Sequence, residues 1–202
     1  MNRTEIVNQI VKKNGALSYL EIGVGNNINF QSIKAVYKVS VDPYEKSTFK
    51  VTSDEYFAGN GAHFDVIFID GLHLEEQAYK DIINSLDCLQ PGGVIVCHDM
   101  SPAQEEDQVR EHTPGKTWNG DVWKAWVTLR KERKDLDMYV IDCDCGCGII
   151  TKGKQDLLVT DLPLTFKNLD ENRKEWLNLK SVEEIEWLDS HNDLCMCVEC
   201  LG

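Results

Sequence analysis

Acidic side chains and histidines stand directly after two apolar runs of the sequence. Asp70 follows the run 64–69, and His98 and Asp99 follow the run 94–97. Carboxylate oxygens with an occasional imidazole are ligands that suit Mg²⁺ or Mn²⁺. If the two runs form neighbouring strands, these three side chains meet at one edge of a sheet. The pattern therefore predicts a divalent metal site at Asp70, His98 and Asp99.

His73, three residues after Asp70, is the candidate general base. An imidazole can take up a proton near neutral pH without a large pKa shift, and Asp99 is the second candidate for that role. Structural alternatives exist for these residues. His73 could cap a helix that starts near Leu74, and His98 and Asp99 could form a hydrogen-bonded pair beneath the loop that follows them.

A glycine-containing turn follows another apolar run. Glu21, Gly23 and Gly25 form the pattern Glu-x-Gly-x-Gly after the run 16–22, and glycine lets the backbone come close to a ligand. A dinucleotide fingerprint needs a further glycine where Ile28 stands, so a pyrophosphate ligand is disfavoured. The turn predicts contact with a ligand that carries no phosphates, and the alternative is a plain tight turn.

Asp42 ends the apolar run 35–41, immediately before Pro43, which breaks the strand. Ligands of doubly wound α/β sheets lie at the carboxyl ends of the strands. A carboxylate at that place can accept two hydrogen bonds from the hydroxyl groups of a ribose. Asp42 therefore predicts a ribose-containing ligand, and the alternative is a solvated acid at a strand end.

The elements that must position these residues alternate along the chain. Continuous apolar runs predict buried strands over residues 16–22, 35–41, 64–69 and 94–97. Periodic apolar residues predict helices over residues 5–13, 27–34, 75–89 and 121–133. Apolar strands that alternate with amphipathic helices are typical of a parallel sheet covered on both faces. The expected fold is therefore α/β.

The last third of the chain predicts a different arrangement. Residues 138–141 and 148–151 are expected to form two closing strands, which are antiparallel because their connection is short. A helix is expected from about residue 167 through Trp176. Ser181 has a capping-box spacing to a glutamate and predicts the start of a second helix.

Residues 100–120 show no periodicity and contain several prolines and glycines. A structureless stretch of this length in a compact domain is usually functional or disordered. We expect it to form a lid and one wall of a binding site, where Trp118, Trp123 and Trp126 could stack on a sugar or an aromatic ring. Trp126 falls at helical spacing and is expected in the core, while Trp123 could belong to either place.

The composition limits the class of protein. The chain has 202 residues, of which 21 are basic and 34 acidic, so its formal net charge is -13. This balance argues against binding to duplex nucleic acid, because phosphate contacts need a surface of lysine and arginine. No apolar run approaches the length of a membrane span, and no apolar signal core follows the first residues. We expect one cytoplasmic domain over residues 1–202, with a core of 1–151, a helical tail of 152–202 and no membrane partner.

The eight cysteines are expected to be reduced, because no secretion signal accompanies them. Cys88 and Cys97 fall in apolar segments and are expected to be small core residues. The remaining six cysteines form two clusters that could alternatively hold a structural zinc ion. These clusters are Cys143, Cys145 and Cys147, and Cys195, Cys197 and Cys200.

Together these motifs resemble the class I S-adenosylmethionine-dependent methyltransferases. The resemblance runs from Tyr19 to about Thr151 and rests on the Glu-x-Gly-x-Gly turn and on the acid that ends the second strand. Three further segments are similar to the small-molecule O-methyltransferases that include the macrolide-sugar and catechol enzymes. These segments are residues 65–73, 89–99 and 118–123.

The resemblance implies a Rossmann-like, doubly wound and mostly parallel sheet of seven strands, the last one antiparallel, followed by C-terminal helices. It also implies S-adenosylmethionine as the cofactor. Gly23 and Gly25 would face its methionine part, although the family's third glycine is replaced by Asn27. The other residues implied for the cofactor are Glu21 and Asp70, Asp42 at the ribose, and Ser53 and Asp54 at the adenine.

The resemblance extends to the metal and the base. Metal-dependent members of the family place an acidic ligand at the position of Asp70 and two further ligands where His98 and Asp99 stand, so the histidine is a departure. Catechol-type enzymes carry a catalytic lysine at the position of His73.

The expected function is O-methylation of a hydroxyl group on a small molecule, such as a sugar, with assistance from Mg²⁺ or Mn²⁺. Two alternatives stay open, a metal-dependent hydrolase or lyase on the same sheet and a non-catalytic nucleoside-binding module. Neither the acceptor nor the oligomeric state follows from the sequence.

Overall fold

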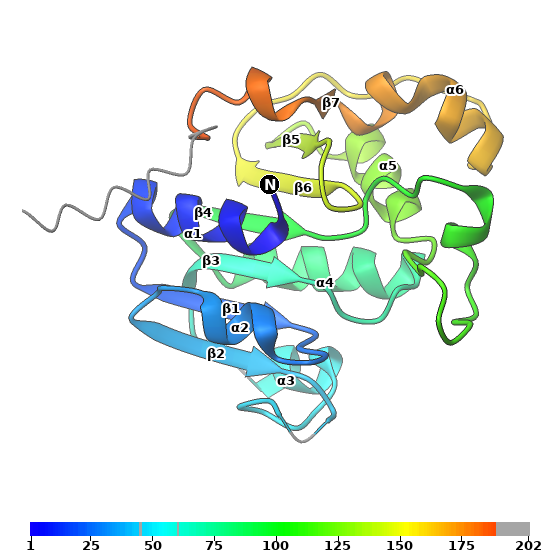
Figure 1. Ribbon diagram of the computed structural model, residues 1–202. Coiled ribbons are helices and arrows are strands. Elements are labelled where there is room, and N and C mark those ends of the chain that lie inside the picture. The colour runs from blue at the N-terminus through cyan, green and yellow to red at the C-terminus, as the bar shows by residue number, and fades with distance from the viewer. Residues whose placement is uncertain (45, 60, 189–202) are drawn as a thin grey trace, which may run out of the picture.

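A sheet of seven strands forms the centre of the computed structural model, which describes residues 1–44, 46–59 and 61–188 (Figure 1). The strands are β1 Ser18–Ile22, β2 Tyr37–Val41, β3 Phe64–Ile69, β4 Leu89–Cys97, β5 Leu136–Ile141, β6 Cys147–Lys152 and β7 Leu179–Lys180. They lie in the spatial order β2-β1-β3-β4-β6-β5-β7. Among them, only β6 runs antiparallel to its neighbours, β4 and β5. The predicted α/β fold is confirmed. The antiparallel strand, β6, is the sixth strand of the chain and not the last one, because the short strand β7 follows it.

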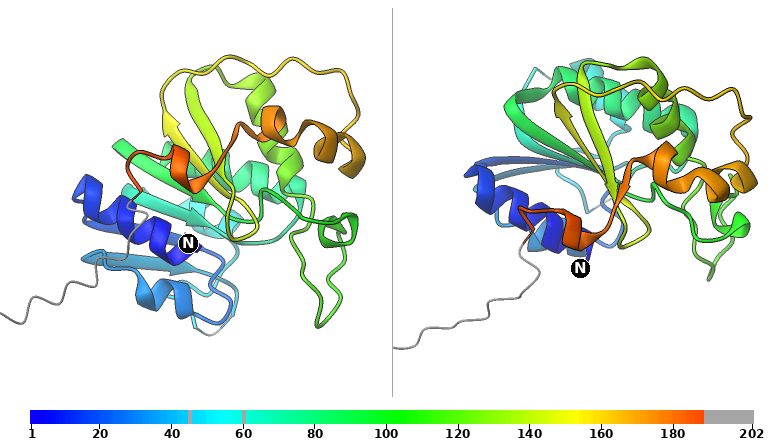
Figure 2. Two further views of the ribbon diagram at one scale, coloured as in Figure 1. Left: turned by 45° about the horizontal axis from the view of Figure 1, so that its top comes forward. Right: turned by 90° about the horizontal axis from the view of Figure 1, so that it is seen from above.

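Helices cover both faces of the sheet (Figure 2). They are α1 Arg3–Asn14, α2 Ile28–Ser32, α3 Ser53–Gly59, α4 Glu75–Asp87, α5 Trp123–Glu132 and α6 Phe166–Leu177. On one face, α4, α5 and α6 share a buried apolar cluster with Leu20 and Ile95 of the sheet. On the other face, α1 packs in a second cluster with Tyr19 and Val96. Because neighbouring residues of one strand enter opposite clusters, both faces are buried, as the continuous apolar runs predict.

The structure corrects the boundary between α4 and β4. The expected helix over 75–89 ends at Asp87, and Leu89 already belongs to β4, where it pairs with Phe64 of β3. The strand therefore begins before Pro91 and the two glycines that follow it, and the register shifts next to Phe64. The apolar periodicity of the helix continues into the strand, which explains why the two elements merge in the sequence pattern.

Other elements differ in extent. The second helix expected in the tail is one 3-10 turn, Val182–Glu184, although Ser181 does form the capping box with Glu184. α3 was not expected, because its seven residues are too short for an apolar periodicity and only Tyr56 among them is fully buried, with Phe57 partly buried beside it. The tail contributes β7 to the same sheet, and the expected division at residue 151 stays a prediction.

Within the described residues, none of the helices combines the length and apolar character that a membrane crossing requires. Cys195, Cys197 and Cys200 lie outside the described residues. Cys97 is buried in β4 and Cys88 is buried directly after α4, as expected of core residues.

Candidate functional site

A pocket of about 540 Å³ opens where β1, β3 and β4 end. Seven of the predicted site residues line it, namely Glu21, Gly23, Gly25, Asp70, His73, His98 and Asp99. Arg3 and Thr4 of α1, Asn29 of α2 and Trp118 of the loop after β4 also contribute. The volume is within the usual range for sites that bind small molecules. The structure thus gathers most of the predicted residues at the carboxyl-terminal edge of the sheet.

The glycine turn passes very close to the end of β3. Gly23 has a φ of 82°, and a Cβ atom added there would lie 2.0 Å from the backbone oxygen of Asp70. No other residue fits this crossing, because the space for a side chain is filled by backbone. Gly25 also has a positive φ, of 51°, but open space surrounds it. The turn therefore presents bare backbone to the pocket.

Asp42 fixes this turn. Its Oδ2 accepts hydrogen bonds from the backbone N–H groups of Val24 at 2.8 Å and Gly25 at 3.5 Å. Its Oδ1 accepts a hydrogen bond from the Tyr44 N–H at 2.9 Å. Asp42 is buried and does not belong to the pocket lining. The solvated-acid alternative is therefore wrong, and its contact with a ribose stays a prediction.

Ser53 and Asp54 join α3 to α4. The Gln77 side chain donates to the Ser53 Oγ at 3.1 Å and to the Asp54 Oδ1 at 3.0 Å, and Lys80 forms an ion pair with Asp54. Neither residue lines the pocket. Their predicted contact with an adenine stays a prediction.

Glu21 is a buried acid in the wall of the pocket. It accepts hydrogen bonds from the Tyr19 hydroxyl group and, at 3.0 Å, from the Asn29 side chain. Burial raises the pKa of Glu21 to about 7, although these two hydrogen bonds act in the opposite direction. Sequence reasoning missed Asn29, which comes from α2 and carries no recognisable motif.

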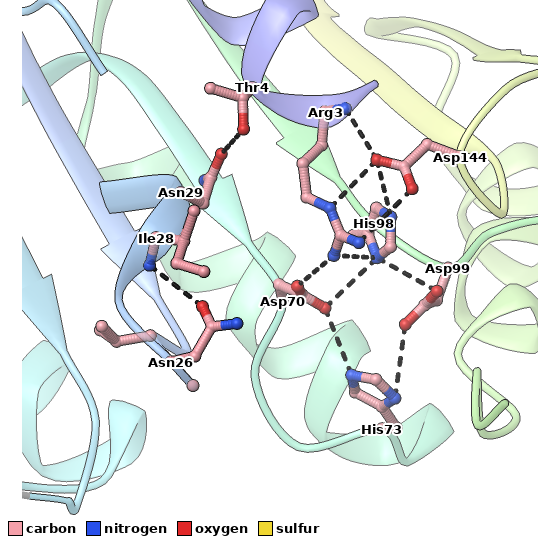
Figure 3. A network of polar contacts seen from close by, with 12 residues as sticks. Arg3, Thr4, Asn26, Ile28, Asn29, Asp70, His73, His98, Asp99 and Asp144 are labelled. Atoms are coloured by element: carbon pink, nitrogen blue, oxygen red, sulfur yellow. Dashed lines mark hydrogen bonds and ion pairs between the residues drawn. The ribbon is translucent and has the colours of Figure 1, made fainter. Parts of the chain in front are cut away.

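Asp70, His73, His98 and Asp99 converge in the same pocket (Figure 3). The His73 Nε2 lies 3.3 Å from the Asp70 Oδ1, and its Nδ1 lies 3.4 Å from the Asp99 Oδ2. The His98 Nδ1 lies 3.1 Å from the Asp99 Oδ1 and 3.5 Å from the Asp70 Oδ1. Two imidazoles therefore lie between two carboxylates, which is an arrangement able to bind and move a proton.

His73 is held by the loop after β4. Its Nδ1–H donates to the Trp118 carbonyl oxygen at 2.9 Å, and the Trp118 ring stacks on the imidazole with ring centres 4.6 Å apart. His73 does not cap α4, because the first turn of this helix is bound by Asp121, which accepts from the Glu75 N–H. The capping alternative for His73 is therefore wrong.

The other tryptophans of this region lie in the core. Trp123 is fully buried, donates to the Gln108 side chain and stacks on Trp176. Trp126 is also fully buried, as expected. Of the three candidates, Trp118 alone lines the pocket.

The charges of the cluster shift its pKa values. Burial opposes ionisation of Asp70, but hydrogen bonds from His73 and His98 outweigh it and hold the pKa of Asp70 far below its usual range. Burial lowers the pKa of His73, yet Asp70 and Asp99 raise it overall. Burial also lowers the pKa of His98, but hydrogen bonds to Asp144, Asp70 and Asp99 outweigh this effect and raise the pKa to about 12.

Arg3 and Asp144 complete the cluster, and sequence reasoning missed both (Figure 3). The Arg3 Nη1 donates to the Asp70 Oδ2 at 3.0 Å and lies 3.1 Å from the His98 Nδ1. The Arg3 Nε and backbone N–H donate to the Asp144 Oδ2 at 3.0 and 2.8 Å. Arg3 lies outside the segment that carries the family resemblance, and Asp144 lies in the turn between β5 and β6. Neither position has a motif that could have revealed it.

The predicted metal ligands lie together, but this donor set fits a divalent cation poorly. Asp70 and Asp99 share a group of ligand atoms within 4.8 Å of one another with His73, whereas the predicted His98 falls in a second such group with Asp144 and Cys147. However, the Asp70 Oδ2 already contacts the guanidinium of Arg3, and the Asp70 Oδ1 faces both histidines. The positive charge that a metal ion would bring is thus already present at Asp70. The metal stays a prediction.

The cysteines of the first cluster, Cys143, Cys145 and Cys147, differ in how deeply they are buried. Cys147 is buried, Cys143 is half-buried, and Cys145 is exposed and lines the pocket. In the described part of the chain, only Cys147 joins a group with metal-ligand spacing, together with His98 and Asp144. Three thiols converging on one zinc ion are therefore not seen in this cluster.

Comparisons with protein families and with curated proteins indicate which proteins this chain resembles. A family model described as a methyltransferase domain matches residues 9–100, which carry β1 to β4 and the site residues from Glu21 to Asp99. No curated protein matches the chain.

Solved structures share the fold. A putative caffeoyl-CoA O-methyltransferase from Staphylococcus aureus has a TM-score of 0.58 and 15% identity over 74% of this chain and 82% of that chain. A putative O-methyltransferase from Klebsiella pneumoniae has a TM-score of 0.57 and 12% identity over 75% and 80%. The O-methyltransferase from Bacillus cereus in complex with S-adenosylhomocysteine has a TM-score of 0.51 and 15% identity over 73% and 78%.

The seven-stranded sheet is the Rossmann-like fold that these O-methyltransferase structures share, and the pocket lies at its carboxyl-terminal edge. The predicted resemblance is confirmed to this extent: residues 9–100 match a methyltransferase domain, and the fold is shared with solved O-methyltransferase structures, one of them in complex with S-adenosylhomocysteine. The residues present also fit S-adenosylmethionine as the cofactor. At Gly23 the backbone leaves no room for a Cβ atom, and beside it the pocket is lined by the buried acid Glu21.

Proposed function

We propose that this chain methylates a hydroxyl group of a small molecule, with S-adenosylmethionine as the methyl donor. The observation that carries the proposal is the convergence of the glycine turn and the Asp70–His73–Asp99 cluster on one pocket. When bound, S-adenosylmethionine supplies an activated methyl group on its sulfonium sulfur. The chain itself binds and orients the two reactants and takes up the proton that the hydroxyl group loses.

The cofactor would lie along the ends of β1 and β2. The bare backbone of Gly23 and Gly25 would face its methionine part, with Glu21 and Asp70 beside it. Asp42 would accept a hydrogen bond from the ribose, because its Oδ1 has a second lone pair after binding the Tyr44 N–H. Ser53 and Asp54 would face the adenine.

His73 is the proposed base. Its Nδ1–H donates to the Trp118 carbonyl oxygen, so the proton from the acceptor goes to Nε2. The Asp70 Oδ1, 3.3 Å away, then stabilises the imidazolium. Asp99 supports the ring from the other side through its Oδ2. No step needs a metal ion, because a guanidinium already contacts the carboxylate at the centre of the cluster.

The acceptor is proposed to be a small hydroxylated molecule, such as a sugar or a phenol. The Trp118 ring forms a flat apolar wall next to His73, and such a ring can stack on a sugar or an aromatic ring. An acceptor that lies against Trp118 would place its hydroxyl group near the base.

The proposal is tested in two steps. Calorimetry with S-adenosylhomocysteine is expected to show binding to the wild-type protein. Radiolabelled S-adenosylmethionine is then offered with a panel of sugars and catechols, and labelled product is expected from at least one. Absence of S-adenosylhomocysteine binding would contradict the cofactor and favour a hydrolase or lyase. Binding without transfer to any hydroxylated compound would favour a non-catalytic nucleoside-binding module.

A further inference from the structure

Arg3 brings a permanent positive charge into the acid cluster. Its guanidinium lines the pocket and bridges two acids, Asp70 at 3.0 Å and Asp144 at 3.0 Å. All three side chains are mostly shielded, with exposed fractions of 34% for Arg3, 21% for Asp70 and 19% for Asp144. A guanidinium does not lose its proton in proteins, so this charge is present at every working pH.

The position of Arg3 is fixed from two sides. Asp144 accepts hydrogen bonds from both the backbone N–H and the Nε–H of Arg3, so helix α1 and its side chain are tied to one carboxylate. The turn that carries Asp144 is itself held against the loop directly after β4, because the Ser101 N–H donates to the Cys145 carbonyl oxygen at 2.8 Å. Gly146 fits there only without a side chain, since an added Cβ would lie 2.5 Å from the Ser101 nitrogen.

This arrangement competes directly with a divalent cation. A metal ion held by Asp70 and Asp99 would lie beside the guanidinium, and two positive charges at such short range repel strongly in a partly buried site. Arg3 also uses the Asp70 Oδ2, while the Asp70 Oδ1 is left to face His73. One carboxylate thus transmits the orientation set by Arg3 to the proposed base.

We propose that Arg3 is the resident cation of this site and takes the place of a divalent metal ion, so that methyl transfer by this chain is independent of metal. The inference rests on the proposed function for the reaction, but its statement about cation binding can be tested separately. Arg3 acts through Asp70 and is therefore a positioning residue.

The test compares Mn²⁺ binding by calorimetry in four proteins: wild type, Arg3→Ala, Arg3→Lys and Arg110→Ala. Arg110 is the matched control, because it forms ion pairs with Glu76 and Asp121 without lining the pocket. Removal of the Arg3 charge is expected to tighten Mn²⁺ binding by at least about tenfold, which corresponds to 1.4 kcal/mol. Arg3→Lys and Arg110→Ala are expected to bind Mn²⁺ as weakly as wild type, which a purely structural role of Arg3 would not predict.

Methyl transfer by wild type is expected to be unchanged after dialysis against EDTA and after addition of Mn²⁺. Tight, stoichiometric Mn²⁺ binding to wild type that Asp70→Asn abolishes would overturn the proposal, and this measurement needs no folded Arg3 variant. Loss of transfer on chelation, restored by Mn²⁺, would overturn it as well. If wild type fails to bind S-adenosylhomocysteine while Arg3→Ala gains Mn²⁺ affinity, the proposed function fails and the cation assignment stands.

Discussion

The two oxygens of the Asp70 carboxylate face different partners. Oδ2 binds the guanidinium of Arg3, and Oδ1 faces the imidazoles of His73 and His98. Cationic partners stabilise the ionised form of a carboxylate, and the carboxylate in turn stabilises a protonated imidazole. The same contact therefore lowers the pKa of Asp70 and raises that of His73.

The raised pKa of His73 predicts the pH dependence of the reaction. A general base must be neutral to accept a proton, so activity should be lost as the pH falls through the raised pKa of His73. We expect kcat/KM for the acceptor to rise with pH with a midpoint above about 6.5, the ordinary value for histidine. In Asp70→Asn, the midpoint should move to lower pH. A midpoint that does not respond to Asp70→Asn, with Asp161→Asn as a remote control, would contradict the role of His73.

Substitution of Asp42 is expected to weaken binding of the cofactor. Asp42→Ala removes the acceptor for the Val24 and Gly25 N–H groups as well as the proposed ribose contact. Binding of S-adenosylhomocysteine should weaken by at least about tenfold, because lost contacts of this kind are worth more than about 1.4 kcal/mol. Calorimetry measures the affinity, and Asp161→Ala, an exposed acid outside the pocket, serves as the control. An unchanged dissociation constant for Asp42→Ala would remove this residue from the cofactor site.

At the scale of elements, the crossing of the β1 turn over the end of β3 is the tightest feature of the site. Gly23→Ala would place a methyl group 2.0 Å from the Asp70 backbone oxygen, while Gly25→Ala meets open space. Both substitutions carry the strain of a left-handed backbone, about 1–2 kcal/mol. Gly23→Ala should lower the free energy of unfolding by a further ~1–3 kcal/mol, because the surrounding backbone must shift. Chemical denaturation of the two variants measures the difference, and equal stabilities would show that the crossing is loose.

Elements that are apolar throughout were predictable from the sequence, because burial on both faces leaves a continuous pattern. β1, β2 and β3 agree closely with expectation. α3 and the start of β4 were not predictable, since α3 has one buried side chain and β4 opens with Pro91 and two glycines. Their structure is decided by pairing and packing with distant segments, as the contact between Leu89 and Phe64 shows.

At the scale of the whole molecule, the difference between local sequence patterns and contacts of distant segments also explains which site residues could be predicted. Asp70, His73, His98 and Asp99 could be found because each follows a recognisable strand. Arg3 and Asp144 could not, because their contact joins positions 141 apart and depends on how α1 docks against the β5–β6 turn. The residue proposed as the resident cation is therefore the one that only the folded chain reveals.

The pocket also predicts how a ligand affects the whole chain. A ligand that binds only the folded state raises the free energy of unfolding, by about 2.7 kcal/mol at a hundred times its dissociation constant. For a chain of this length, S-adenosylhomocysteine at that excess should raise the Tm by roughly 5–10 °C. Differential scanning calorimetry measures the shift, and adenosine diphosphate, which carries a pyrophosphate, should give a smaller one. An equal or larger shift with the diphosphate would contradict the ligand class.

The loop after β4 has a consequence for how acceptor range can change. Trp118 forms the wall against which an acceptor would lie, and its carbonyl oxygen and ring also hold the proposed base. The adjacent Asn119 side chain donates to Asp99 of the same cluster. Substitutions at Trp118 or Asn119 that change the choice of acceptor are therefore expected to change the reactivity of the proposed base as well. Efforts to evolve this protein toward bulkier acceptors should start from the α2 side of the pocket, where Ile28 contributes to the wall without contacting the base or Arg3.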